Sequence, residues 1–256
     1  MKKILLLNKK EGETPLETLG RFRAKNKKYK DVKMTYAGRL DPMASGLLLV
    51  LAGEKVKNQE KYLKLDKEYE FEVLFGFATD TYDILGKILS SKISRLRNGQ
   101  VTNIGRLEKN IKANLKFFRG KWKQKYPLYS SKTVKGKQLW QYGRENLEPE
   151  IPEREVMVKK LQLSGVKTIT SQKLLQNIEK RVAKVSGDFR QKEILKTWRQ
   201  NLNVQHSALN IASFKIKCSS GTYVRGIADL LGAKMSVPAL AFSIKRTKIG
   251  KFGKIT

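Results

Sequence analysis

The apolar run Leu47–Ala52, which Gly53 closes, is the longest stretch that can place the core of this chain. A membrane-spanning helix needs roughly 20 apolar residues, so a run of this length predicts a buried strand instead. The shorter apolar run Ile4–Leu7 also predicts a buried strand. It is too short for a secretory signal, which needs about 7 apolar residues, and polar Asn8 follows at once. The sequence therefore predicts a cytoplasmic protein with no membrane segment.

Patterns elsewhere in the chain predict a mixture of strands and helices. Tyr69–Phe75 and Phe214–Cys218 alternate between apolar and polar residues, as half-buried strands do. Helical spacing of apolar residues predicts three helices, namely Pro15–Lys27 with Thr14 as N-cap, Ile104–Leu115, and Tyr223–Leu231 with Gly232 as the C′ residue.

Residues 166–207 are predicted to be an insertion that forms a helical hairpin. Its apolar residues make two helical stripes, the first with Leu174, Leu175, Ile178, Val182 and Val185, the second with Ile194, Leu195, Trp198 and Leu202. Gly187 separates the stripes, and Asp188 with Gln191 is a candidate capping box. Because strand patterns stand on both sides of the hairpin, we expect a single α/β domain of the α+β type over residues 1–256.

Lysine and arginine outnumber aspartate and glutamate by 54 to 23, which gives a formal net charge of +31. A compact domain with this charge repels itself unless an anionic partner offsets it, and nucleic acid is the usual partner. Lys112–Arg144 has ten Lys or Arg, no acid and seven aromatic residues, which suits phosphate contacts and base stacking. A solvated lysine-rich surface is the alternative. The charge does not choose between RNA and DNA, or between a binding protein and an enzyme.

The chain has one cysteine, Cys218, and one histidine, His206. This excludes an internal disulfide framework, Cys/His structural zinc sites and metal sites with two histidines. The sequence has neither a G-x-x-x-x-G-K-[ST] phosphate loop nor a G-x-G-x-x-G motif, so no metal and no nucleotide cofactor is predicted. We interpret Cys218 as a buried strand residue and His206 as a surface or RNA-contact residue.

The segment Tyr36–Gly46 carries the most chemical information. Gly38 and Gly46 permit unusual backbone angles, and Pro42 fixes the chain just after Asp41. A carboxylate is therefore held on a stiff, irregular loop beside the longest apolar run. A surface Asp-Pro turn has the same residues, so the loop by itself leaves a catalytic and a purely structural role open.

This segment resembles the G-x-L-D-P-x-A-x-G motif of the TruB family of tRNA pseudouridine synthases. Other blocks of that family follow in its order, and the resemblance covers roughly residues 1–165 and 208–256. The blocks are K-x-Y at residues 67–69, T-D-T-x-D-x-x-G at 79–86, and P-x-Y-S at 127–130 with Gly136, Leu139 and Arg144. C-S-x-G-T-Y-I-R follows at 218–225 with Val224 for the isoleucine, and L-R-R-T-x-x-G-x-F at 244–252 with Ile244 for the leucine and Lys245 for the first arginine. Each block alone is weak evidence, but together and in order they are specific.

The chain also departs from the family pattern. Tyr36 stands where the family usually has histidine, Lys9-Lys10-Glu11-Gly12 replaces K-P-x-G, and Thr133 aligns with a family lysine although Lys132 is adjacent. The insertion is not part of the common pattern, and no C-terminal RNA-binding PUA domain is expected.

The resemblance implies the pseudouridine synthase fold, a mixed and mostly antiparallel sheet flanked by helices. It implies an isomerase, an intramolecular transferase that converts the T-loop uridine at tRNA position 55 to pseudouridine without a cofactor. Asp41 would be the essential aspartate, acting as a nucleophile or as a base on the sugar. Arg225 would keep that carboxylate ionised, and Tyr69 would stack against the flipped base. The implied partner is the T arm of tRNA, and we expect a monomer.

Contacts to this RNA are expected from residues in or near the family blocks, namely Tyr36, Arg39, Lys121, Lys123, Lys125, Tyr129, Lys132, Tyr223 and Arg246. The resemblance places a mobile thumb that grips the T loop in Lys112–Arg144. The insertion either adds an RNA grip or is a solvated helical pair packed on the sheet. Two other functions remain open, a non-catalytic RNA-binding or RNA-folding protein and a pseudouridine synthase with another RNA target.

Overall fold

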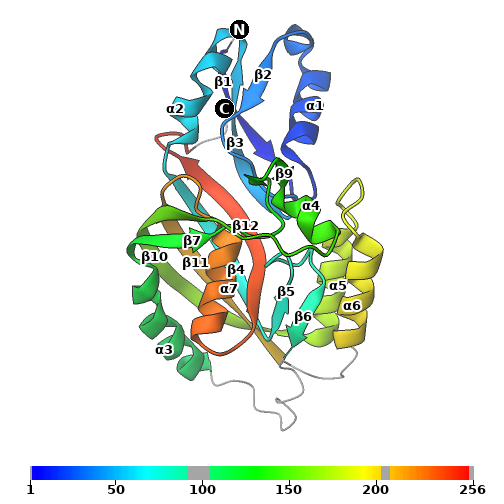
Figure 1. Cartoon of the computed structure of the whole chain (residues 1–256), viewed down its shortest axis with the longest axis vertical. Helices are drawn as coiled ribbons and strands as arrows, with labels where there is room; N and C mark the ends of the chain where they lie inside the picture. The colour runs from blue at the N-terminus through cyan, green and yellow to red at the C-terminus, as the bar shows by residue number, and fades with distance from the viewer. Residues whose placement is uncertain (1, 92–103, 203–207, 254–256) are drawn as a thin grey trace.

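The computed structural model describes residues 2–91, 104–202 and 208–253. An eight-stranded sheet extends along the longest dimension of the molecule (Figure 1). The strand order is β1-β3-β12-β4-β11-β10-β7, and β2 also pairs with β3. These strands are β1 (Ile4–Lys9), β2 (Met34–Tyr36), β3 (Ala44–Ala52), β4 (Lys67–Phe75), β7 (Gly120–Lys125), β10 (Glu153–Thr170), β11 (Ala208–Cys218) and β12 (Ala239–Ile249). The short strands β5 (Phe77–Thr79) and β6 (Ile88–Ser91) pair with each other, as do β8 (Thr133–Val134) and β9 (Lys137–Gln138).

Neighbouring strands of the large sheet are antiparallel except β3 and β12, which run parallel over residues 44–46 and 244–246. This confirms the mixed, mostly antiparallel sheet. The parallel pair requires a glycine at position 46, where φ is 102° and a Cβ would lie 2.3 Å from the carbonyl oxygen of Arg246. Gly46 therefore lets the strand that follows Asp41 lie directly against β12.

Helices cover both faces of the sheet around β4 and β11. On one face, α3 (Ile104–Asn114) and α7 (Val224–Lys234) pack on a buried apolar cluster that includes Phe71 and Phe214. On the other face, α5 (Ser171–Val182) and α6 (Gln191–Leu202) pack on a second cluster that includes Leu74. Phe71 and Leu74 point to opposite faces because side chains alternate along a strand. The core is therefore divided between the two faces, and Figure 1 shows α7 and the α5–α6 pair over different parts of it.

The N-terminal part of the sheet has its own small cores at the top of Figure 1. The helix α1 (Pro15–Lys25) packs through Leu19 on one face of β1 and β3, and α2 (Gln59–Leu63) places Tyr62 on the other. Thr14 and Glu17 form a capping box at the start of α1, which confirms the predicted N-cap. The helix ends at Lys25, two residues before the predicted end, because Asn26 leaves the helical conformation.

The hairpin of α5 and α6 forms as predicted, but it begins later than residue 166. β10 stays paired with β11 up to Thr170 opposite Ala208, so residues 166–170 belong to the sheet. The predicted capping box of Asp188 and Gln191 is wrong. The helix begins at Gln191 itself, whose side-chain oxygen accepts from the N–H of Phe189. The apolar stripes of both helices pack on the sheet, as the sequence predicts, and a role of the insertion as an RNA grip stays a prediction.

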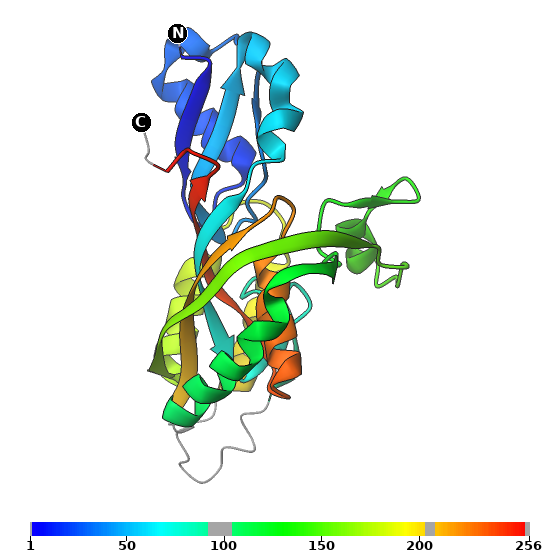
Figure 2. The same ribbon diagram turned by 90° about the vertical axis from the view of Figure 1, so that its left-hand side faces the viewer.

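The acid-free segment Lys112–Arg144 divides between the sheet and a projecting arm. Lys121, Lys123 and Lys125 lie on β7, which pairs with β10 along the whole of its length. The expectation of a mobile thumb in this segment stays a prediction. Only residues 126–147, which carry β8, β9 and α4 (Leu139–Arg144), stand away from the sheet in Figure 2, and we call them the arm.

Gly232 does not cap α7 as predicted, because the helix continues to Lys234. A Cβ at position 232 would lie 2.6 Å from the Cβ of Ala239, so close packing against β12 accounts for this glycine. No helix of the described residues is both long enough and apolar enough to span a bilayer.

Candidate active site

Asp41 lies on the loop between β2 and β3, and the backbone beside it is fastened from the N-terminal segment. The Nζ of the buried Lys9 donates to the carbonyl oxygens of Pro42 at 3.2 Å and Ala44 at 2.5 Å. The N–H of Gly12 also donates to Pro42, at 2.9 Å. Burial lowers the pKa of Lys9 to about 8. The loop is thus held on both sides of Asp41, in agreement with the stiff loop that its sequence predicts.

Arg225 reaches Asp41 from the first turn of α7. Its Nε donates to Oδ2 of Asp41 at 2.8 Å, Nη1 to the carbonyl oxygen of Thr81 at 2.6 Å, and Nη2 to that of Tyr129 at 2.7 Å. The Arg225 side chain is 3% exposed and the Asp41 side chain 41%. With all three nitrogens engaged, the planar guanidinium has a fixed orientation. Within the described part of the chain, Oδ1 of Asp41 accepts no hydrogen bond, so one carboxylate oxygen is free to meet a ligand.

A second carboxylate, that of Asp83, lies in the same electrostatic environment. It is buried and accepts from Oγ1 of Thr81 and from the N–H of Leu85, both at 2.9 Å. Burial raises the pKa of Asp83 to about 6, against the opposing charge of Arg225. Burial disfavours the charge on Arg225, but Asp41 and Asp83 outweigh it and raise the pKa of the guanidinium. Asp83 is the last aspartate of the T-D-T-x-D block, and its place in that block was the signal in the sequence that pointed to it.

Tyr69 lies on β4 beside this pair. It is aligned with Arg246 on β12 and Ile216 on β11. Burial raises the pKa of Tyr69 to about 12, and the charge of Asp41 adds to the rise while Arg246 opposes it. The phenol is therefore neutral at physiological pH and within electrostatic range of Asp41. The structure thus brings together the three side chains expected to act in catalysis.

Aromatic side chains from the arm and from the residue before α7 lie beside Arg225. The ring of Tyr223 lies 5.8 Å from the guanidinium of Arg225 and packs edge-on against Tyr126 at 5.7 Å. Tyr129 uses its carbonyl oxygen for Arg225 and donates from its hydroxyl to the carbonyl oxygen of Gly143 at 3.0 Å. Tyr129 therefore connects Arg225 to α4 of the arm.

Two basic residues, Arg39 and Lys132, lie near the Asp41 loop and the arm. Arg39, two residues before Asp41, donates to Oγ of Ser131 at 2.6 Å, which ties the Asp41 loop to the arm. The Nζ of Lys132 lies 5.6 Å from the ring centre of Tyr126 and is exposed. RNA contacts from these residues, from Tyr129 and from Tyr223 stay predictions.

Arg246 is buried, which corrects its expected RNA contact. Its guanidinium donates to the carbonyl oxygens of Leu47 at 2.7 Å and of Arg39 and Gly38 at 3.2 Å each. These bonds support the Asp41 loop from within the protein and leave no exposed guanidinium for a phosphate.

The three lysines of β7 point away from the side where α7 lies. Gln124, which alternates with Lys123 and Lys125, makes two hydrogen bonds of 2.9 Å to the backbone of Tyr223 on that side. Successive side chains of a strand point to opposite faces, so Lys121, Lys123 and Lys125 share the other face, where they are exposed.

Tyr36 is half-buried, and it packs against the apolar cluster between α1 and β3. Its expected RNA contact stays a prediction. Cys218 is buried on β11 as predicted, whereas His206 lies outside the described residues. In the described ranges, His, Cys, Asp and Glu side chains form no group of three that could hold a metal ion.

Comparison with known proteins agrees with this geometry. Residues 25–182 match the family described as TruB family pseudouridylate synthase (N terminal domain), a range that extends across α5. A tRNA pseudouridine synthase B of Caldicellulosiruptor saccharolyticus is 30% identical, and the alignment covers 98% of this chain and 69% of that protein. Proteins of the same name from Caldanaerobacter subterraneus and Endomicrobium trichonymphae are each 32% identical, over 86% and 97% of this chain and 60% and 85% of theirs.

Among solved structures, the chain is similar to one in the crystal structure of a Cbf5-Nop10-Gar1 complex. The TM-score is 0.54 at 18% identity, and the match covers 98% of this chain and 50% of that one. This likeness supports the fold, and the chain spans about half the length of that solved protein. The family match and the relatives above show that the chain belongs to the TruB family of pseudouridylate synthases.

Proposed function

We propose that this chain is a tRNA pseudouridine synthase that isomerises the T-loop uridine at position 55 to pseudouridine. The observation that carries the proposal is the ion pair of Asp41 and Arg225, which holds a carboxylate with one free oxygen on a braced loop. Its relatives are named tRNA pseudouridine synthase B, which supplies the substrate class.

The chemistry of this isomerisation fits the residues present. The bond between N1 of uracil and C1′ of ribose breaks, the base turns, and a bond from C5 to C1′ replaces it. C5 loses a proton and N1 gains one, so no electrons enter or leave. The free Oδ1 of Asp41 either attacks the sugar carbon or removes a proton from the sugar. Arg225 favours the ionised carboxylate that both routes need.

The target base must leave its stack to reach Asp41, which costs a few kcal/mol. Tyr69 offers a neutral aromatic face beside the carboxylate, and base–aromatic stacking contributes about 1–3 kcal/mol. The bound base would also cover Asp41, whose side chain is otherwise 41% exposed. Stacking by Tyr69 therefore offsets part of the flipping cost at the point where the chemistry occurs.

The proposed partner is the T arm of tRNA, which the net charge of +31 attracts. Asp41, Tyr69 and Arg225 all come from one chain, so a monomer contains the whole proposed site. A tRNA substrate supports the cytoplasm as the proposed location. Residues 1–256 would act as one catalytic domain, with the insertion of α5 and α6 as part of it.

The test is to incubate the purified protein with tRNA transcripts and to map pseudouridine along them. Product at position 55 that disappears in Asp41→Asn, while this variant still binds tRNA, is the expected result. Tight binding without product in the wild type would favour a non-catalytic RNA-binding protein. Product at other positions or only in other RNAs would favour a synthase with a different target.

A further inference from the structure

Two arginines span the same pair of loops, one from inside the site and one from outside. Arg225 donates to the backbone carbonyl oxygens of Thr81 and Tyr129. Arg190 contacts the neighbouring side chains, because its Nη1 lies 2.7 Å from Oδ2 of Asp80 and its guanidinium lies 4.3 Å from the ring centre of Tyr129. Thr81 and Tyr129 are 48 residues apart in the chain, and the two arginines join their loops beside a direct interaction between the side chains of Asp80 and Tyr129.

Both contacts of Arg190 are shielded from solvent. The side chains of Arg190 and Asp80 are each 15% exposed, so their charge attraction is stronger than that of a surface pair. Asp80 is itself fixed, since its Oδ1 accepts from the N–H of Lys87 at 2.9 Å. The planar guanidinium can pair with a carboxylate and lie over an aromatic ring at the same time, which an ammonium group cannot do as well.

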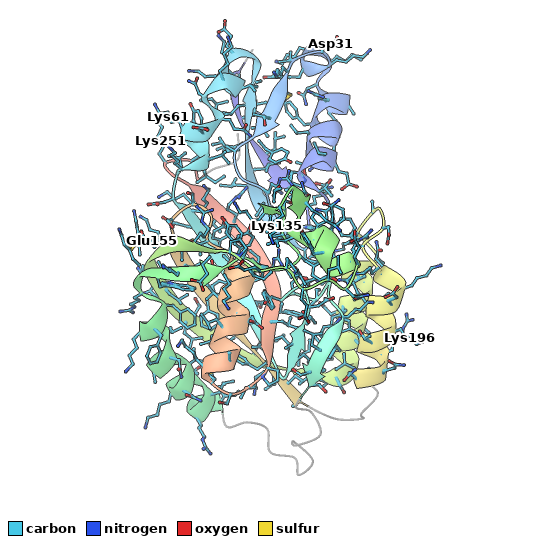
Figure 3. The ribbon with its side chains drawn as sticks, in the orientation of Figure 1. Asp31, Lys61, Lys135, Glu155, Lys196 and Lys251 are labelled. Carbon is cyan, nitrogen blue, oxygen red and sulfur yellow. The ribbon has the colours of Figure 1, made fainter. Side chains whose placement is uncertain are left out.

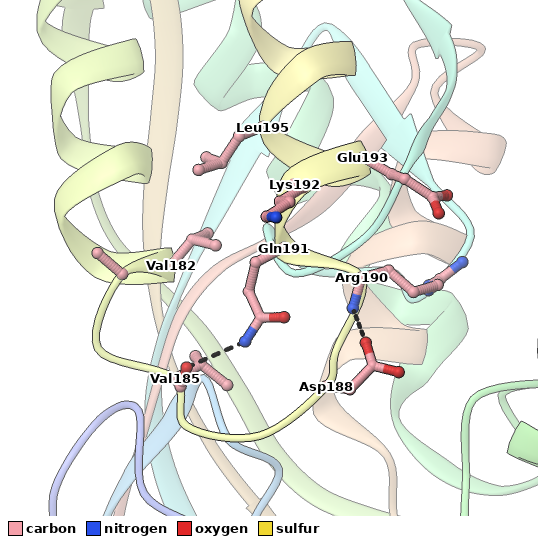
Figure 4. Close-up of a pocket in the computed structure, with 9 residues that line it drawn as sticks. Val182, Val185, Asp188, Arg190, Gln191, Lys192, Glu193 and Leu195 are labelled. Carbon is pink, nitrogen blue, oxygen red and sulfur yellow. Dashed lines mark hydrogen bonds between the residues drawn. The ribbon is translucent and has the colours of Figure 1, made fainter.

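The connection between α5 and α6 holds Arg190 in place. Gln191 donates from Nε2 to the carbonyl oxygens of Val185 at 3.0 Å and Gly187 at 2.7 Å, and Asp188 accepts from the N–H of Arg190 at 3.1 Å (Figure 4). Asp188 also forms an ion pair of 3.1 Å with Arg144 at the end of α4. An open cavity of about 500 Å³ lies on this connection, and the Arg190 side chain points away from α5 in the same view.

We propose that Arg190 is a positioning residue for the reaction, acting through Asp80 and Tyr129 to keep the carbonyl oxygens of Thr81 and Tyr129 where they orient Arg225. The inference rests on the proposed function and gives the inserted hairpin a part in it. Arg190 itself touches neither Asp41 nor the reacting atoms. It acts by fixing a guanidinium that must meet a carboxylate within a few tenths of an ångström.

The test compares Arg190→Met with Arg199→Met in the purified full-length protein. Met keeps the length of the side chain and removes the charge and the planar group. Arg199 is the matched control, because it lies exposed on α6 and its ion pair in the described residues is with the half-buried Glu179 of α5 at 2.7 Å. For each variant we would measure the single-turnover rate at saturating tRNA, the tRNA dissociation constant, the melting temperature and the Nε–H NMR signal of Arg225, assigned by its loss in Arg225→Lys.

We expect Arg190→Met to lower the single-turnover rate on the order of tenfold or more, since a misplacement of about 1 Å can cost up to 10²-fold. The dissociation constant and the melting temperature should follow those of Arg199→Met, and the Arg225 signal should shift or broaden. Arg190→Lys, which keeps the charge near Asp80, should recover part of the rate.

An unchanged Arg225 signal in Arg190→Met would overturn the inference. A rate loss matched by an equal loss of tRNA affinity would also overturn it, because Arg190 would then be an RNA contact. Absence of product in the wild type would refute the proposed function, and the Arg225 signal would still decide whether Arg190 positions that side chain.

Discussion

Asp41 and Arg225 form an ion pair of 2.8 Å in which the arginine is 3% exposed and the aspartate 41%. The buried partner has two further bonds to backbone carbonyl oxygens, so its position does not depend on the carboxylate. Arg225 is thus part of the preorganised wall of the site, and Asp41 is the member that can exchange contacts when a nucleotide arrives. This asymmetry allows one group to stabilise charge while the other reacts.

Arg225→Lys should lower the single-turnover rate by about 10²-fold or more, because one ammonium cannot reproduce the planar fork that meets three fixed oxygens. The affinity for tRNA should stay within a few-fold of wild type, since the side chain is buried. Rapid-quench kinetics at saturating tRNA, with filter binding alongside, would check both values. Arg119→Lys, at an exposed position, is the control. A loss of affinity as large as the loss of rate would contradict the assignment.

Arg246→Met should destabilise the protein by about 2–4 kcal/mol, because it leaves the buried carbonyl oxygen of Leu47 and the part-buried ones of Gly38 and Arg39 without their donor. Urea unfolding followed by circular dichroism measures this change. The folded fraction should bind tRNA as the wild type does. Unchanged stability together with weaker tRNA binding would restore Arg246 as an RNA contact.

Changing Lys121, Lys123 and Lys125 together to Glu should weaken tRNA binding and flatten its salt dependence, if the outer face of β7 meets phosphates. Each lost phosphate contact lowers the slope of log affinity against log salt by about 1. The control changes the exposed Lys173, Lys180 and Lys196 of the hairpin to Glu, and Figure 3 shows Lys196 pointing outward from α6. Equal effects of the two triple variants would show that only total charge matters at β7. A greater effect of the hairpin variant would identify the insertion as an RNA grip.

Asp229→Asn should stabilise the protein at neutral pH and leave its stability unchanged in acid. Burial in α7 raises the pKa of Asp229 to about 6 from 3.8, so the ionised form disfavours the folded state. This cost is absent below about pH 4 and fully present above about pH 6. After discounting for partial exposure, the gain in Asp229→Asn should reach about 1–2 kcal/mol. Unfolding free energies at pH 4, 5, 6 and 7 would reveal this rise, and a gain that is constant with pH would contradict it.

Local patterns predicted the elements with a continuous apolar run, such as β1, or with regular spacing, such as α1 and β4 from Tyr69 onward. They missed β12, whose pairing with β4 shifts register after Ala241 and again after Arg246, so its sequence does not alternate cleanly. They also missed the first part of β10, which has register shifts near Val158 and Leu163. Bulges of this kind serve the curvature of a sheet and leave no periodic signal.

Family motifs predicted the residues of the candidate site, whereas the directions and contacts of their side chains depend on the folded chain. A motif names Arg246 but does not say whether its guanidinium points to solvent or to the carbonyl of Leu47. Arg190 lies outside every motif, and its partner Asp80 is 110 residues away. Such contacts depend on how the hairpin packs on the sheet, which the order of residues alone does not state.

The final long strand of the described chain lies in the middle of the sheet. β12 joins β3 on one side to β4 on the other, and Gly46 meets Arg246 across the parallel pair. During synthesis, the strands on the β3 side and those on the β4 side therefore cannot form one sheet until residues 239–249 have left the ribosome. Until then the nascent chain lacks Arg246, whose guanidinium supports the Asp41 loop from within the protein.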